Sequence, residues 1–190
     1  PSRRLPLSEV LRGANESIIS ELTSMPDWKA LQRYSHKVHS AVFSEVRLDE
    51  ELGMLRVMRV VSAVAAGRIL NAKTAHSQIM GAVVGGIGMA LHEETVIDHR
   101  YGRFINHNFA EYHVPVNADI HDIDVIFVDE VERHLNPLGV KGLGEIGIVG
   151  TAAAIANAVY HATGVRVRDL PITIDKLLGL TPPRTALGAG

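Results

Sequence analysis

The stretch Val42–Val61, VFSEVRLDEELGMLRVMRVV, decides the fold that we predict for this chain. Two runs in it, residues 42–48 and 55–61, alternate apolar with polar side chains, which is the pattern of strands with one buried face. Between the runs lie three acidic residues and Gly53, a composition that favours a turn. The stretch therefore predicts a β-hairpin.

Residues 74–94 follow the periodicity of a helix. The apolar stripe of this helix consists of Ile79, Val83, Ile87 and Leu91. A second stripe consists of Gln78, Gly81, Gly85 and Gly88. Each glycine inside a helix costs about 0.5–1 kcal/mol relative to Ala, so three on one stripe indicate that something approaches this side closely. A cofactor in a groove and a tightly packed second helix both fit the pattern.

The remaining segments predict a mixture of helices and strands. Residues 123–128 alternate like a strand, residues 149–161 form an Ala-rich helix closed by Gly164, and residues 165–168 form a short strand ended by Pro171. Residues 7–24 predict a pair of peripheral helices, and residues 173–178 a last helical turn. The expected fold class is α+β, with mixed sheets, a glycine-rich helix and an Ala-rich helix. We expect a peripheral helical segment at 1–33, a main domain at 34–178 and a flexible tail at 179–190.

Composition narrows the possible functions. The 190 residues suffice for one sizeable core, and a net charge of −2 without a run of Lys or Arg argues against nucleic acid and an anionic membrane as partners. The chain has no Cys, which excludes disulfides and iron–sulfur clusters held by its own residues. The apolar stretch 79–91 is shorter than the about 20 residues that span a bilayer, and residues 1–6 look like an internal cut in a longer chain. These features predict a soluble protein, either cytoplasmic or periplasmic.

Residues 141–147, Lys-Gly-Leu-Gly-Glu-Ile-Gly, surround one carboxylate with glycines just before a helix. They match G-x-G-x-x-G, but a dinucleotide-binding loop needs a strand running directly into the first glycine, and residues 136–139 interrupt that connection. Glu145 is placed either to face a ligand as a base or to cap the following helix. The local pattern leaves both roles open.

Four longer strings carry a resemblance to a known family. They are AGRILNAKT at 66–74, NPLGVKGLGEIGIVG at 136–150, AAAIANAV at 152–159 and ATGVRVRDLPIT at 162–173. The chain resembles the C-terminal part of the molybdopterin-binding large subunit of the xanthine dehydrogenase and aldehyde oxidase family, most closely its bacterial aldehyde-oxidising members. The similarity covers residues 34–178. Ala72 and Gly85 depart from the family pattern, in which a proline and a bulkier residue such as Gln stand there.

The resemblance implies roles for individual residues. Glu145 corresponds to the general base of the reaction. The cofactor-binding positions that it implies are Arg68, Ile69, Leu70, Asn71, Ala72, Lys73, Thr74, Gln78, Lys141, Gly142, Leu143 and Gly144. It implies no metal ligand from this chain, and the spacing of His92, His99, His107 and His113 fits no zinc site. A plain tight turn at 141–144 and a polar loop leading into a helix at Thr74 are the purely structural alternatives.

The resemblance also implies a cofactor and partners. The cofactor would be Mo-molybdopterin, in its cytosine dinucleotide form, while iron–sulfur clusters and FAD would lie on partner subunits. The substrates would be aldehydes, oxidised to carboxylic acids, or N-heterocycles, and the rest of the large subunit would complete the pocket. The alternative is an isolated, non-catalytic domain that folds or oligomerises without a cofactor.

Overall fold

The computed structural model describes residues 5–18, 20, 29 and 32–178. The chain divides into two compact units, residues 1–33 and 34–190. In the first unit, α1 (Leu7–Gly13) is a short helix without buried residues. This helix confirms the start of the predicted pair, and much of residues 14–24, which would contain its second member, lies outside the described residues.

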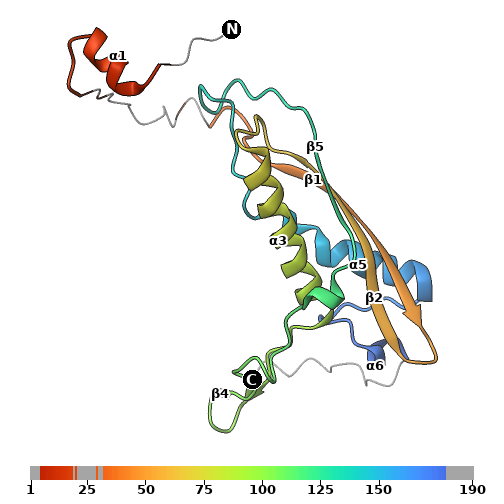
Figure 1. Cartoon of the computed structure of the whole chain (residues 1–190). Coiled ribbons are helices and arrows are strands. Elements are labelled where there is room, and N and C mark those ends of the chain that lie inside the picture. The colour runs from red at the N-terminus through yellow and green to blue at the C-terminus, as the bar shows by residue number, and fades with distance from the viewer. Residues whose placement is uncertain (1–4, 19, 21–28, 30–31, 179–190) are drawn as a thin grey trace. The chain divides into compact units, whose positions relative to one another are not determined.

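The second unit is built on a three-stranded mixed sheet (Figure 1). Strands β1 (His39–Asp49) and β2 (Met54–Ala65) form the predicted antiparallel hairpin, whose turn has Gly53 at φ 60°. Strand β5 (Ile123–Phe127) pairs with β2 on the side away from β1. The two strands are parallel, because the chain crosses back over the sheet between them. The predicted hairpin and the predicted strand at 123–128 are therefore confirmed, and so is the α+β class with a mixed sheet.

Helices pack against one face of this sheet. The long helix α3 (Ala72–Leu91) contacts both α4 (Ile146–Val149) and α5 (Thr151–Thr163), and α5 runs along β1. Gly164 closes α5 at φ 73°, as predicted for a left-handed cap. Helix α6 (Ile174–Leu177) provides the last helical turn.

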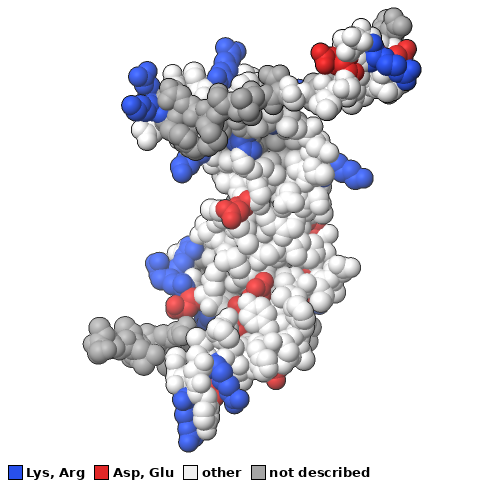
Figure 2. Space-filling view, turned by 90° about the vertical axis from the view of Figure 1, so that its left-hand side faces the viewer, with Lys and Arg blue, Asp and Glu red and all other residues white. Residues whose placement is uncertain are grey.

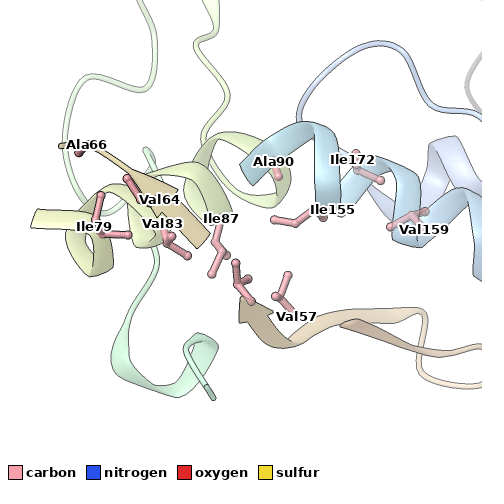
Figure 3. Close-up of a cluster of buried hydrophobic side chains, with 11 residues drawn as sticks. Val57, Val64, Ala66, Ile79, Val83, Ile87, Ala90, Ile155, Val159 and Ile172 are labelled. Carbon is pink, nitrogen blue, oxygen red and sulfur yellow. The ribbon is translucent and has the colours of Figure 1, made fainter. Parts of the chain in front are cut away.

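The core lies between β2, α3 and α5 (Figure 3). From α3 it takes Ile79, Val83 and Ile87, three of the four residues of the predicted apolar stripe, and Leu91 packs at its edge. Residues 146–163 are long and apolar enough to cross a membrane by length and composition alone. They form two helices joined at Gly150, and the second contributes the buried side chains of Ile155 and Val159 to this core.

The glycine stripe of α3 is explained in part by helix packing. A β-carbon on Gly85 would meet the Ile148 side chain at 3.4 Å, so α4 passes close to that position. The neighbouring Gly86, which was not part of the predicted stripe, lies closest to α5. Gly81 has nothing within 4 Å of the place where its β-carbon would be. Tight packing of a second helix therefore accounts for the middle of α3, and Gly81 is left facing open space.

The prediction of a strand at residues 165–168 was wrong. Side chains alternate there between half-buried and exposed, but the backbone pairs with no strand in the part of the chain that the structure describes. Instead the Arg166 guanidinium lies 4.0 Å from the centre of the Tyr160 ring and donates to Asn157, both on α5. Residues 165–168 pack along α5, where no strand is available to pair with them. The alternation of half-buried and exposed side chains therefore forms no β-ladder.

Three small elements were not predicted. Strands β3 (Ile97–Asp98) and β4 (Arg103–Phe104) form a separate two-stranded hairpin, and η1 (Asn117–Asp119) is a single 3-10 turn. On the face drawn in Figure 2, Lys and Arg side chains are scattered among uncharged residues and form no single patch.

Candidate functional site

Two segments that are far apart in the sequence meet at the start of α3. Gly67, after β2, pairs with Val140 in an isolated antiparallel bridge. The Arg68 N–H donates to the Gly139 carbonyl at 2.7 Å, and the Lys141 N–H donates to the Ala66 carbonyl at 3.2 Å. The structure therefore brings together the two groups of predicted site residues, 68–78 and 141–145.

Glycine is required on both sides of this crossing. Gly67 has φ 65° and Gly139 has φ 69°, a backbone region that side chains with a β-carbon rarely adopt. A β-carbon on Gly67 would also lie 2.5 Å from the Gly139 carbonyl oxygen, and one on Gly139 would lie 2.8 Å from the Glu132 carbonyl oxygen. The backbones can cross this closely only without side chains.

The predicted pterin loop leads into α3. Asn71 is the N-cap, and its side chain accepts from the Thr74 N–H at 3.1 Å, while the Thr74 hydroxyl donates back to the Asn71 carbonyl at 3.3 Å. These two residues therefore begin the helix, as the structural alternative expected. The exposed residues of this region are Arg68, Leu70, Asn71, Ala72, Lys73, Thr74 and Gln78, whereas Ile69 is half-buried against the core.

A cavity of about 490 Å³ opens beside this loop. Arg68, Ile69 and Ala72 line one side of it. The other side is lined by residues 127–132 and 137–139, which lead from β5 into the crossing. The cavity thus joins the loop before α3 to the segment before the glycine-rich turn.

Glu145 stands at the N-cap position of α4 with its side chain exposed. It makes no side-chain capping hydrogen bond, so the capping role that the sequence left open is not what the structure shows. A β-carbon on Gly147 would lie 2.8 Å from the Ala82 β-carbon and 3.1 Å from the Ile79 carbonyl oxygen. This contact packs the residue after the Glu145 turn against Ile79 and Ala82 of α3, close to Gln78 in the sequence.

The turn before Glu145 is open to its surroundings. Gly142 and Gly144 are exposed, and among the residues that the structure describes no atom beyond their chain neighbours lies within 4 Å of the position where either β-carbon would be. Leu143 between them is half-buried and packs against the core. Strand β5 ends well before Gly142 and α4 has four residues, so the strand, glycine loop and helix of a dinucleotide-binding unit do not follow one another here.

Lys141 points away from this open turn. Its side chain is 4% exposed and its ammonium pairs with Glu130 and, at 3.6 Å, with Glu132. It also donates to the Lys37 carbonyl at 3.3 Å. The hydrogen bond from Lys141 lowers the pKa of Glu130 below its ordinary value of 4.5, and the same bond raises the pKa of Lys141 above 10.5.

The sequence did not indicate the two acidic partners of Lys141. Glu130 and Glu132 lie two residues apart beyond the end of β5, and both half-buried side chains face the Lys141 ammonium. Two acidic residues spaced two apart just after a strand are a sequence signal that could have identified them. Asn136 was also not singled out, although its amide accepts from the N–H groups of Leu138 and Val140 and shapes the turn into the crossing.

A second cavity, of about 450 Å³, lies elsewhere in the larger unit. It lies near the β3–β4 hairpin and is lined by Thr95, Phe104, Asn106, His107, Asn108, Phe109 and Tyr112. It contains none of the predicted site residues. Within the described ranges, no three or more His, Asp or Glu side chains gather in a way that could hold a metal ion.

Comparison with known proteins places the chain in a family. Residues 7–121 match the family described as the molybdopterin cofactor-binding domain. The chain is 50% identical over 151 residues to the aldehyde oxidoreductase molybdenum-binding subunit PaoC of Escherichia coli (strain K12), an alignment that covers 80% of this chain and 21% of that protein. It is 37% identical over 135 residues to the putative xanthine dehydrogenase molybdenum-binding subunit XdhA of the same organism, covering 71% of this chain and 18% of that protein.

The fold is similar to a solved enzyme of the same kind. The aldehyde oxidoreductase of Desulfovibrio desulfuricans superposes with a TM-score of 0.67 at 30% identity, covering 76% of this chain and 16% of the other. The chain thus spans about a fifth of the length of the curated relatives that it matches. It belongs to the molybdopterin cofactor-binding domain family and is similar to part of the molybdenum-binding subunits of aldehyde oxidoreductases and xanthine dehydrogenases.

Proposed function

We propose that this chain forms part of the active site of a molybdenum hydroxylase, with Glu145 as the general base. The observation that carries the proposal is the state of Glu145: an exposed carboxylate, free of a capping hydrogen bond, on a glycine turn that is joined to the loop before α3. A carboxylate so placed is available to a ligand and held by backbone contacts.

The glycines of the turn support a ligand at this place. Gly142 and Gly144 do not adopt positive φ, and their surroundings within the chain are open, so neither conformation nor internal packing demands glycine there. Glycine destabilises a folded turn because its backbone loses more conformational entropy on folding than that of other residues. Its advantage is that another group can approach the backbone closely. We infer that the metal end of a molybdopterin cofactor is the group that approaches. Gly81 of α3 offers a similar open position.

The loop before α3 would hold the rest of the cofactor. Exposed Arg68 and Lys73 supply cations, and Asn71 and Gln78 supply amides, which suit the phosphates and the pterin ring. The cavity of about 490 Å³ beside this loop offers room for part of such a group. We favour the cytosine dinucleotide form, whose additional phosphate and base would need this extended polar surface. Lys141 would contribute through its backbone, since its ammonium is committed to Glu130 and Glu132.

The bound cofactor would supply the redox chemistry and the transferred oxygen. The role of this chain is to accept a proton at the Glu145 carboxylate and to orient the cofactor through residues 68–78 and 141–144. For that purpose the Glu145 carboxylate must be free to accept a proton, and its side chain is exposed and makes no capping hydrogen bond.

The relatives suggest the substrates and partners. One relative is named an aldehyde oxidoreductase subunit, and another is the nicotine 6-hydroxylase large subunit of Paenarthrobacter nicotinovorans, 34% identical over 139 residues. We propose aldehydes or N-heterocycles as substrates of the complete enzyme. Since this chain has no Cys, iron–sulfur clusters would lie on a partner subunit, with FAD on another.

The sheet offers a surface for the rest of the large subunit. Phe43 is 66% exposed and Ile126 is 51% exposed, and the strand register places both on the face opposite the helices, around Ala63. An apolar sheet face of this kind marks an interaction surface. Because the matched segment makes up only 21% of the PaoC subunit, we propose that other segments of a large subunit cover this face.

The test is molybdenum and pterin content of the protein purified with whatever chains assemble with it, followed by Glu145→Gln. Stoichiometric molybdenum and a fall in turnover of about 10²- to 10⁴-fold in the variant, at unchanged molybdenum content, are expected. A protein without metal and pterin would refute the proposal and favour the isolated, non-catalytic domain. Normal turnover of a loaded Glu145→Gln variant would refute the catalytic role.

A further inference from the structure

We propose that Glu130 is a positioning residue of this site: its carboxylate fixes the glycine turn that carries Glu145 relative to the loop before α3. The inference rests on the proposed function and adds a residue to it. Glu130 lies on neither of the two segments that it would hold, because it belongs to the stretch after β5.

The two oxygens of Glu130 contact the two segments separately. One oxygen accepts from the Gly67 N–H at 2.7 Å, at the point where the loop leaves β2. The other accepts from the ammonium of Lys141, at the point where the glycine turn begins. One carboxylate therefore joins both sides of the Gly67–Val140 bridge.

The environment makes this link strong. Lys141 is 4% exposed and Glu130 is 27% exposed, so solvent screens their attraction less than it would at the surface. Hydrogen bonds between charged groups are about twice as strong as neutral ones. Losing either partner would leave the other charge with little water to replace it.

Glu132 does not share this role. One of its oxygens accepts from the N–H groups of His134 and Leu135, at 2.6 and 3.1 Å, and so closes its own turn. Its other oxygen is 3.6 Å from the Lys141 ammonium, longer than a hydrogen bond. Glu130 thus differs from Glu132 in that its two oxygens accept hydrogen bonds from both segments, from Gly67 and from Lys141.

The position of Lys141 constrains that of Glu145. Only Gly142, Leu143 and Gly144 separate the two residues, and both glycines are exposed. The turn is anchored by Lys141 at its start, by Leu143 against the core, and by the packing of Gly147 on α3 at its end. Releasing Lys141 would free the first of these three anchors.

The test is Glu130→Gln in the complete assembled enzyme. The glutamine side chain has the size of glutamate, and its amide oxygen can accept from the Gly67 N–H. Its NH₂ group then faces the Lys141 ammonium, and two donors cannot form a hydrogen bond with each other. Turnover per bound molybdenum should fall about tenfold or more, with KM within about twofold of the wild type. Amide hydrogen exchange should accelerate in peptides covering residues 66–71 and 137–145, and stay unchanged in β1 and β2.

Asp124→Asn is the matched control. It removes a carboxylate from an exposed pair with Arg59 on the same sheet, and turnover and exchange around the site should not change. Should Glu130→Gln not fold, Glu130→Met with Lys141→Met removes both charges together and allows the same measurements.

Two results would overturn the inference. The first is a Glu130→Gln variant that contains less molybdenum but has normal turnover per bound molybdenum. That result indicates a purely structural role for Glu130. The other is faster exchange throughout the unit and not only at the two segments. If instead the wild-type protein contains no molybdenum, the proposed function fails, and exchange at residues 66–71 and 137–145 still decides whether Glu130 holds them together.

Discussion

Gly86 of α3 and Thr151 of α5 are in such close contact that a β-carbon on Gly86 would lie 2.5 Å from the β-carbon of Thr151. Thr151 is fully buried and its hydroxyl donates to the Gly147 carbonyl at 2.7 Å, so it cannot move aside without losing that bond. This contact sets the spacing between the helix that carries Gln78 and the helices that follow Glu145.

Gly86→Ala should therefore destabilise the protein. Overpacking a tight core costs about 1–3 kcal/mol, which exceeds the roughly 0.5–1 kcal/mol that alanine gains in a helix. Urea unfolding would measure the change. Gly81→Ala is the control on the same helix: its side is open, so alanine should raise the free energy of unfolding. A stabilised Gly86→Ala would show that the two helices can separate freely.

Gly67→Ala should disrupt the crossing between the two segments of the site. The residue has φ 65°, and the new β-carbon would lie 2.5 Å from the Gly139 carbonyl oxygen. We expect a loss of at least about 1 kcal/mol of stability together with reduced molybdenum content. Gly102→Ala is the control. Gly102 has φ 63°, but its β-carbon would meet no described atom, so the stability that this variant loses measures the cost of the backbone angle without the contact.

Glu145→Gln should change stability by no more than about 0.5 kcal/mol. The side chain is exposed and makes no capping hydrogen bond, so neutralising it removes no contact that the structure shows. Thermal or urea unfolding of the wild type and the variant checks this. A loss above 1.4 kcal/mol, about tenfold in the folding equilibrium, would mean that Glu145 supports the helix after all.

Lys141→Met should lower stability near neutral pH by about 1.5–3 kcal/mol, the value of a hydrogen bond between charged groups. The pKa of Glu130 is lowered on folding, so its contribution is present above the ordinary value of 4.5 and disappears as the pH falls through the lowered pKa. The pKa of Lys141 is raised, so its contribution is present below 10.5 and disappears as the pH rises through the raised pKa. In pH-dependent unfolding, the variant should lose the dependence that comes from Lys141 and show a weaker dependence from Glu130, to which the Gly67 N–H still donates.

Phe43→Asp should weaken assembly with the rest of the large subunit and leave this unit folded. Phe43 is 66% exposed on the open sheet face, so its loss removes few contacts within this unit. Co-purification and size-exclusion chromatography would detect the change. Leu52→Asp, 72% exposed at the hairpin turn, is the control and should assemble normally. Equal assembly of both variants would exclude this face as the interface.

The sequence by itself determined most of the secondary structure. Alternation of side chains predicts strands, and a spacing of three to four residues predicts helices, because both depend on neighbours along the chain. The hairpin of β1 and β2, the helix α3 with its buried Ile79, and the cap at Gly164 follow from such local patterns. The candidate site residues 68–74 and 141–145 came from the resemblance of longer strings to a known family, and not from these local patterns.

Only the tertiary structure decided how those parts meet. Residues 165–168 alternate like a strand, yet a strand needs a partner, and Arg166 packs on Tyr160 instead. Whether Glu145 caps a helix or stays available depended on how its turn is seated on α3. The link through Glu130 joins Gly67 to Lys141 across more than seventy residues of sequence. Contacts over such separations depend on how the sheet and helices pack, which no local pattern contains.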